Sequence, residues 1–328
     1  MKQIIVITAL ICFSWLGLSA QNFPQAEISN KVIKAKLYLP DLEKGYYQGT
    51  RFDWSGVMPE LEYKGHSFFA QWFDNYDPKT HDAILGPVEE FFELGYDKAK
   101  VGEEFVRIGI GGLKKTKEKS FNRFGFYEVS SPGKWDIKTA ADRVTFIHTL
   151  NDVAGYSYVY TKTVFLKEGE PKLVLQHSLK NTGKQAIETV AYNHNFFVID
   201  NQPIGPEIVI KLPFDIIGKW SNPNGPSVID GKNIRYTREL NAKESVMISD
   251  LQGHSNRVSD YDFRIENIKT GAGVRITSDR PVSKIIFWSN PMTSCPEPYI
   301  DINVKPGEEF TWDTTYEFYT FPPNYNLK

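Results

Sequence analysis

The sequence predicts an all-β protein, and three of its features lead to that prediction. Aromatic residues make up 14% of the chain, with 22 Phe and 17 Tyr, and aromatic and β-branched residues favour strands over helices. Several segments alternate apolar and polar residues, which is the period of a strand with one buried face. Long windows with the 3.6-residue period of an amphipathic helix are missing. Many short strands separated by turns indicate a sandwich or a barrel.

The predicted strands share this alternation or are rich in aromatic and β-branched residues. They cover residues 32–39, 143–148, 156–165, 172–179, 186–192, 274–277, 283–288 and 312–318. The sequence Asn181-Thr182-Gly183 separates two of them and is typical of a tight turn, because glycine adopts positive φ without strain. Two other regions, residues 46–93 and 203–233, are expected to be long loops, which are often functional in a compact domain.

The first 20 residues have the pattern of a secretory signal peptide. Lys2 precedes an uncharged and mostly apolar run over residues 4–18, and the small residues Ser19 and Ala20 end it. The run is short for a membrane span, which needs about 20 apolar residues. We therefore expect cleavage after Ala20 and export to the periplasm or out of the cell.

Charge and cysteine content narrow the class of protein further. The formal net charge of −2 argues against a nucleic-acid partner, because such binding needs a basic face. No later stretch is long and apolar enough to span a membrane. After the expected cleavage Cys295 is the one remaining cysteine, so stability must come from the core without a disulfide. We expect one β-sandwich domain over residues 21–328, with a division near residue 140 as the alternative.

Two segments of the C-terminal half carry the most specific motifs. Residues 191–197 read Ala-Tyr-Asn-His-Asn-Phe-Phe, and they end a predicted strand that follows the Asn-Thr-Gly turn. Residues 278–281 read Ser-Asp-Arg-Pro and precede an aromatic strand, the segment Cys-Pro-Glu-Pro at 295–298 and the turn Lys-Pro-Gly-Glu at 305–308. In this order the motifs resemble the aldose 1-epimerase (galactose mutarotase-like) family, over roughly residues 140–320.

The resemblance implies a β-supersandwich, in which large and mostly antiparallel sheets are stacked. It also implies that His194 is the general acid and Glu297 the general base of a mutarotase. Asp301 is the alternative base, because the spacing after Trp288 is shorter than in typical members of the family. In mutarotation a base takes the proton of the C1 hydroxyl while an acid protonates the ring oxygen, and the pKa values of carboxylate and imidazole suit these steps.

The N-terminal half departs from the family. The His-Gly-Gly and Asn-Arg-Ile segments that help the family to hold its sugar are missing from residues 46–120. Residues 47–54 and 81–91 mix aromatic and charged residues instead, which fits either a platform for a sugar or a core with a charged rim. The predicted sugar-binding residues are Arg51, Glu89, Asn193 and Trp288.

Three functions are consistent with these residues. The first is epimerisation at the anomeric carbon of a sugar, and the second is carbohydrate binding without catalysis on the same fold. The third is glycoside cleavage, which needs two carboxylates about 5–10 Å apart, supplied by Glu297 with Glu89 or Glu90. In each case the expected partner is a mono- or oligosaccharide. No metal or other cofactor is expected, because the six histidines lack metal-ligand spacing.

Overall fold

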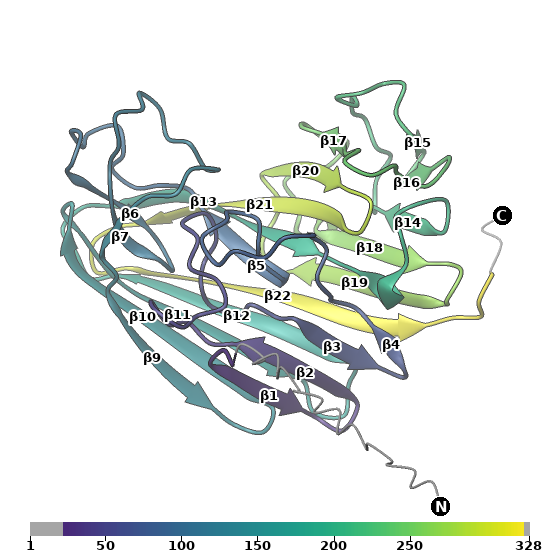
Figure 1. Cartoon of the computed structure of the whole chain (residues 1–328), viewed down its shortest axis with the longest axis horizontal. Helices are drawn as coiled ribbons and strands as arrows, with labels where there is room; N and C mark the ends of the chain where they lie inside the picture. The colour runs from purple at the N-terminus through teal and green to yellow at the C-terminus, as the bar shows by residue number, and fades with distance from the viewer. Residues whose placement is uncertain (1–21, 325–328) are drawn as a thin grey trace, which may run out of the picture.

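The computed structural model describes residues 22–324, and these residues form strands with little helix (Figure 1). The all-β prediction is therefore confirmed. Two short 3-10 turns, η1 (Ile199–Asn201) and η2 (Val258–Asp260), are the helical elements of the described chain. No helix within residues 22–324 has the length and hydropathy needed to cross a membrane. The predicted signal peptide, residues 1–20, lies outside the described residues.

The largest sheet has ten strands, each antiparallel to its neighbours. Its two edges are formed by the first and last strands of this spatial order, and Figure 1 shows its long central strands crossing the molecule. The order is β15 (Ser227–Asp230), β16 (Asn233–Tyr236), β14 (Ile208–Lys211), β18 (Asp262–Asn267), β19 (Ala272–Ser278), β22 (Glu309–Thr320), β12 (Lys172–Asn181), β11 (Tyr156–Leu166), β10 (Arg143–Val153) and β9 (Lys134–Thr139).

Three smaller sheets accompany it. The five-stranded sheet has the order β17 (Val246–Ile248), β20 (Lys284–Ser289), β21 (Ser294–Val304), β13 (Ile187–Phe196) and β5 (Gly86–Phe91). The four-stranded sheet consists of β1 (Gln25–Ser29), β2 (Ile33–Tyr38), β3 (Glu60–Tyr63) and β4 (His66–Ser67). The three-stranded sheet consists of β6 (Glu104–Arg107), β7 (Gly111–Lys114) and β8 (Val129–Ser131).

One face of the ten-stranded sheet is covered by the smaller sheets. On β22 the inward side chains alternate with half-exposed ones, as the period of a strand requires. Trp312 on this strand lies against Phe91 of β5, with ring centroids 6.1 Å apart. Phe318 of the same strand lies against Phe68, which follows β4, with ring centroids 4.6 Å apart. The stacking of large antiparallel sheets agrees with the predicted supersandwich.

The strands predicted at residues 143–148, 156–165 and 172–179 lie within β10, β11 and β12, and the one predicted at 186–192 overlaps β13. The expectations that residues 46–93 and 203–233 form loops are wrong in part, since the first region contains β3, β4 and β5 and the second contains β14 and β15. All six residues of β5 are buried, so both of its faces are covered. A strand that is buried on both faces has no alternation of polarity for the sequence to display.

Charged side chains are buried between β5 and the ten-stranded sheet. Lys162 of β11 forms ion pairs with Glu89 of β5 and with Asp53, the latter at 3.7 Å between Nζ and Oδ2. The Nε2 atom of His177 on β12 lies 3.0 Å from Oε1 of Glu89. Burial would raise the pKa of Glu89, but Lys162 and His177 outweigh it and hold that pKa at about 2. Glu89 is therefore a structural carboxylate that joins the two sheets.

This arrangement predicts a large loss of stability when Lys162 is replaced by methionine. The substitution keeps most of the side-chain volume but leaves Glu89 and Asp53 without their buried cation, which costs about 3–5 kcal/mol. The measurement is the free energy of unfolding in urea. Lys180→Met is the control, because this exposed lysine on β12 should change stability by no more than about 0.5 kcal/mol. A loss below about 1 kcal/mol in Lys162→Met would contradict the prediction.

Candidate active site

The outer face of the five-stranded sheet carries the histidine of the Asn-His-Asn motif. Because side chains alternate along a strand, His194 and Phe196 of β13 lie on this face, where their rings stack with centroids 3.9 Å apart. Asn193 and Asn195 point to the opposite face. There Asn193 donates a 2.7 Å hydrogen bond to Glu89, and Asn195 accepts one of 2.8 Å from the hydroxyl of Tyr316 on β22.

Strand register brings Glu297 beside His194. β21 pairs with β13 in antiparallel register, with Tyr192 opposite Tyr299, so His194 and Glu297 are the next pair on the same face. The Nε2 atom of His194 lies 3.3 Å from Oε1 of Glu297, and their side chains are 4% and 6% exposed. An imidazole and a carboxylate from distant parts of the sequence therefore form a buried contact.

Both side chains line a cavity of about 190 Å³. Its floor comes from β13, β17, β20 and β21, where Trp288 lies opposite Met247 in one strand pair, and Ile286 lies opposite Glu297 in another. Its walls come from the segment between β2 and β3, from the segment between β4 and β5, and from the loop between β7 and β8. The lining residues are Arg51, Asp82, Arg123, Phe124, His194, Phe196, Met247, Ile286, Trp288 and Glu297.

The wall segments supply charge and an aromatic ring to the cavity. Arg51 is buried and ion-paired with Asp82 and with Glu90 of β5, the latter at 2.8 Å. Its guanidinium lies 5.1 Å from the ring of Phe124, within cation–π range. Phe124 is 56% exposed. The cavity therefore has an aromatic surface at its mouth and hydrogen-bonding groups inside.

Glu90 holds these walls to the sheet. Its buried carboxylate accepts hydrogen bonds from Arg51, Arg107 and the hydroxyl of Tyr192. Arg123 lies 3.5 Å away, from Nε to Oε1 of Glu90. Burial would raise the pKa of Glu90, but Arg51, Arg107 and Arg123 outweigh it and hold that pKa at about 2. Glu90 stays ionised and binds side chains from the segment between β2 and β3, from the loop between β7 and β8, and from β6 and β13.

Burial sets the protonation of the His194–Glu297 pair. Burial, reinforced by Arg51 and Arg123, lowers the pKa of His194 well below its usual value. Burial raises the pKa of Glu297 to about 7, with Glu90 and Asp82 acting in the same direction and Arg51 and Arg123 opposing it. Below about pH 7 the pair therefore holds one titratable proton, which resides on Glu297. The Nδ1 atom of His194 is buried without a hydrogen-bond partner among residues 22–324.

The structure brings together four of the six predicted site residues. His194, Glu297, Arg51 and Trp288 line the same cavity, whereas Glu89 and Asn193 do not. Those two lie on the inner face of the sheet, bonded to each other, so they cannot contact a ligand in this cavity. The alternative base, Asp301, is exposed and lies further along β21, outside the cavity.

Several residues that line the cavity were not predicted from the sequence. Arg123 and Phe124 belong to a loop without periodic pattern, although residues 121–126 read Phe-Asn-Arg-Phe-Gly-Phe, a concentration of aromatic residues around an arginine. Asp82 falls inside the segment 81–91 that the sequence identified as rich in charges and aromatics. Met247 and Ile286 carry no chemical signal, and strand register alone places them at the site.

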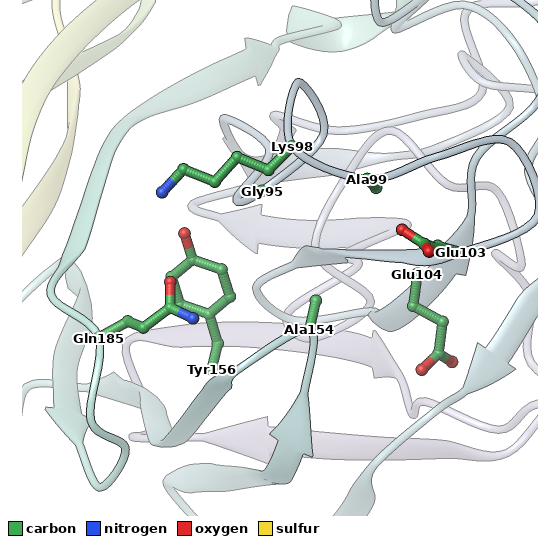
Figure 2. Close-up of a pocket in the computed structure, with 8 residues that line it drawn as sticks. All are labelled: Gly95, Lys98, Ala99, Glu103, Glu104, Ala154, Tyr156 and Gln185. Atoms are coloured by element: carbon green, nitrogen blue, oxygen red, sulfur yellow. The ribbon is translucent and has the colours of Figure 1, made fainter.

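A larger cavity of about 380 Å³ lies near β6 and the start of β11 (Figure 2). Figure 2 shows Tyr156 and Gln185 near one another on one side and Glu103 and Glu104 on the other. Glu104 accepts a 2.7 Å hydrogen bond from Ser131, which ties it to β8. None of the eight lining residues is a histidine or an arginine, so this cavity lacks the acid–base pair found at the sheet.

The described part of the chain holds no cluster of three or more His, Cys, Asp or Glu side chains arranged to bind a metal ion. A carboxyl group and an imidazole in contact can supply one acid and one base to a ligand between aromatic walls.

The fold of this chain, but not its sequence, resembles that of known proteins. No family model and no curated protein matches the sequence. Among solved structures, the chain resembles an aldose epimerase homologue from C. elegans with a TM-score of 0.54 and 14% identity, covering 91% of this chain and 99% of that one. It also resembles a putative aldose 1-epimerase from Escherichia coli K12, with a TM-score of 0.53, 12% identity and coverages of 90% and 100%.

A third solved structure gives the same result. A galactose mutarotase-like protein from Lactobacillus casei has a TM-score of 0.53 and 12% identity, and the match covers 90% of this chain and 100% of that one. The chain thus has the galactose mutarotase-like fold over nearly its full length, as the motifs of its C-terminal half indicated. At these identities the likeness establishes the fold alone.

The protonation of the pair predicts opposite pH dependences of stability for two variants. In Glu297→Gln, the folded state keeps a neutral His194, whereas the unfolded state binds a proton below the usual histidine pKa of 6.5. Stability should therefore rise with pH, relative to the wild type, between about 4.5 and 6.5. In His194→Gln, the folded state keeps the Glu297 proton up to about pH 7, whereas an unfolded glutamate releases it near 4.5. Stability should fall with rising pH over that range.

The measurement is the free energy of unfolding in urea from pH 4.5 to 7.5. Each slope should approach about 1.4 kcal/mol per pH unit, the value for one proton. The wild-type pair contributes almost no slope between pH 4.5 and 6.5, because the folded and unfolded states each hold one proton there. If the free energy of unfolding changed with pH in the same direction in both variants, the proton would not be held by Glu297 beside a neutral His194.

Proposed function

We propose that the protein is an aldose 1-epimerase-like enzyme that interconverts the anomers of a sugar. The observation that carries this proposal is the contact between His194 and Glu297 at one cavity with aromatic walls. The solved structures of the same fold include a putative aldose 1-epimerase and galactose mutarotase-like proteins, which supports a sugar as ligand. The sugar would bind with its anomeric carbon at the pair.

The closeness of the pair suits the reaction. The C1 hydroxyl oxygen and the ring oxygen of a pyranose are bonded to the same carbon, so the acid and the base must act on neighbouring atoms. As the base removes the hydroxyl proton, a carbonyl group forms at C1, the bond from C1 to the ring oxygen breaks, and the acid protonates that oxygen. Rotation about the C1–C2 bond followed by the reverse steps yields the other anomer. Positioned acid and base groups contribute about 10²–10⁴-fold each to such rates.

The single proton of the pair is sufficient for the whole cycle. In the direction that the resemblance implies, His194 donates to the ring oxygen and Glu297 accepts from the C1 hydroxyl. The reaction in that direction begins with the proton on His194. The proton reaches His194 from Glu297 across the 3.3 Å contact between them, and the net charge of the pair does not change. Ring opening moves the proton back to Glu297, and ring closure returns it to His194. The pair is thus restored by the reaction itself.

The surrounding residues would hold the ring. Trp288 lies near the pair, with its ring centroid 5.8 Å from that of His194, and Phe124 stands at the mouth of the cavity. Aromatic rings pack against the apolar faces of a pyranose, while Arg51 and Asp82 offer hydrogen bonds to its hydroxyl groups. Arg51 is fixed by Glu90, so its position does not depend on the ligand.

The glycoside-cleavage alternative receives less support from this geometry. Glu89 and Glu90, the expected partners of Glu297, are fully buried and bound to cations on either side of β5. Neither lines the cavity that contains Glu297. Binding without catalysis has no separate observation in its favour, and it becomes one outcome of the test below. We also propose export, on the basic, apolar and small-residue pattern of residues 1–20.

The direct test of catalysis is the rate at which freshly dissolved α-anomers of glucose, galactose and other aldoses equilibrate, followed by NMR. The wild-type protein should accelerate at least one of them. His194→Ala and Glu297→Gln should each lower the catalysed rate by about 10²–10⁴-fold, because each removes one proton-transfer group. His254→Ala is the matched control, since this histidine lies beside Phe214 and lines no part of the cavity.

Each result has a distinct meaning. Acceleration that persists in His194→Ala and Glu297→Gln would support the activity and refute this site. No acceleration with any aldose would refute the enzyme and favour the carbohydrate-binding alternative, which glycan-binding measurements would then test. Circular dichroism of each variant would show whether a lost rate reflects a lost fold.

The exposed ring at the cavity mouth gives a second prediction. Phe124→Ala should raise KM about tenfold and leave kcat within about twofold, because a stacking contact of roughly 1–1.5 kcal/mol acts equally on ground and transition states. Phe126→Ala is the control, since Phe126 belongs to the same loop and is 48% exposed but does not line the cavity. Equal effects of the two substitutions would show that the loop, rather than the ring of Phe124, matters.

A further inference from the structure

A second cavity adjoins the first along the outer face of the five-stranded sheet. It measures about 290 Å³, and its lining includes Phe92, Lys284, Tyr299 and Asp301. Arg123 and Ile286 line both cavities. The two cavities therefore lie side by side at these shared side chains, and together we call them the extended groove.

Strand β21 runs along the floor of the extended groove. Glu297, Tyr299 and Asp301 are alternate residues of this strand, so their side chains follow one another on the same face. The rise of a strand separates the first and last of them by about 13 Å. One pyranose ring at the His194–Glu297 pair cannot reach Asp301, and the second cavity has room for a separate chemical unit.

The groups in the second cavity are suited to a polyhydroxylated unit. The Nζ atom of Lys284 lies 5.7 Å from the centroid of the Tyr299 ring, and the side chains of Lys284 and Asp301 are exposed. Neither residue takes part in an ion pair within residues 22–324. The cavity thus offers a free ammonium group and a free carboxylate beside the aromatic residues Phe92 and Tyr299, the combination of donors, acceptors and apolar surface that sugars bind.

Arg123 lies at the junction of the two cavities. Its guanidinium lies 5.1 Å from the ring of Phe92 and 5.9 Å from that of Tyr192. The side chain is 29% exposed, and Glu90, at 3.5 Å from its Nε, is its ion-pair partner among the described residues. A guanidinium has five N–H donors, so donors remain for ligand groups on both sides.

We infer that the substrate is a reducing disaccharide or a longer reducing oligosaccharide. Its reducing unit binds at His194 and Glu297, and the next unit binds in the second cavity against Phe92, Lys284 and Asp301, with Arg123 donating hydrogen bonds to both. Mutarotation needs a free anomeric hydroxyl, so the next unit is joined through another hydroxyl of the reducing unit. This inference rests on the proposed function for the first cavity.

The test compares the binding of single sugars with that of disaccharides that have a free reducing end. Titration calorimetry would use glucose against maltose, cellobiose, lactose, isomaltose, gentiobiose and melibiose, which all have glucose as their reducing unit and differ in linkage or in the second sugar. At least one disaccharide should bind about tenfold more tightly than its reducing unit alone, the effect of one or two hydrogen bonds to charged groups. Equal or weaker binding of all six would overturn the inference.

A double variant locates the effect. Lys284→Ala with Asp301→Ala should remove most of the tenfold preference and leave binding of the single sugar unchanged. The matched control is Lys138→Ala with Asp136→Ala, which removes the same two residue types from the exposed face of β9. A preference that survives in the first double variant, or that is lost equally in both, would contradict the second cavity as its source.

Failure of this inference and failure of the proposed function give different results. Catalysed anomerisation of glucose or galactose without any preference for disaccharides would leave the enzyme and refute the extended groove. Tighter binding of a disaccharide that depends on Lys284 and Asp301, without catalysis of any sugar, would support the groove and refute the epimerase.

Discussion

The ionised carboxylate of Glu90 is the interaction on which the candidate site depends. It lies on β5 at the edge of the five-stranded sheet, and it binds Arg51 from the segment between β2 and β3 and Arg107 from β6. It also lies close to Arg123 from the loop between β7 and β8. These segments share no strand pairing with β13 or β21, so their ion pairs with Glu90 help to hold them beside the cavity floor. Without this carboxylate, Arg51, Arg107 and Arg123 would lose their shared anion.

The two neighbouring glutamates of β5 divide the buried charge between the faces of the sheet. Glu89 points inward to Lys162 and His177, and Glu90 points outward to the arginines. A buried ion pair is weak evidence for stability, because desolvation offsets much of the attraction. Here the ion pairs also hold different segments of the chain in place, since each cation comes from a different element. Burial, reinforced by Arg51 and Arg123, favours a neutral His194, and burial also keeps the proton on Glu297.

The fold could be predicted from the sequence where one face of a strand is exposed. Residues 156–165 of β11 and 312–318 of β22 alternate because water covers one side of the ten-stranded sheet. β5 could not be found in this way, since both of its faces are buried. His194 and Glu297 could be named from short motifs, but their contact depends on the register of β13 against β21, which no local pattern specifies.

The remaining site predictions differ from the structure for a simple geometric reason. Asn193 adjoins His194 in sequence, yet neighbouring residues of a strand point to opposite faces, so the asparagine lies in the core. The same rule separates Glu89 from Glu90. Arg123 and Phe124 come from a loop, where position is fixed by the ion contact with Glu90 and not by periodicity. Sequence reasoning thus locates strand residues better than the loop residues that complete a binding site.

The open ten-stranded sheet leaves the edge of β9 without a neighbouring strand within the described chain. Unpaired edges invite the strands of other molecules and so begin aggregation. On β9 the exposed side chains of Lys134, Asp136 and Lys138 place a charge at every second residue. A strand from another molecule would have to place its own side chains beside these charges in order to pair. The charges of β9 thus oppose growth of the ten-stranded sheet beyond one molecule.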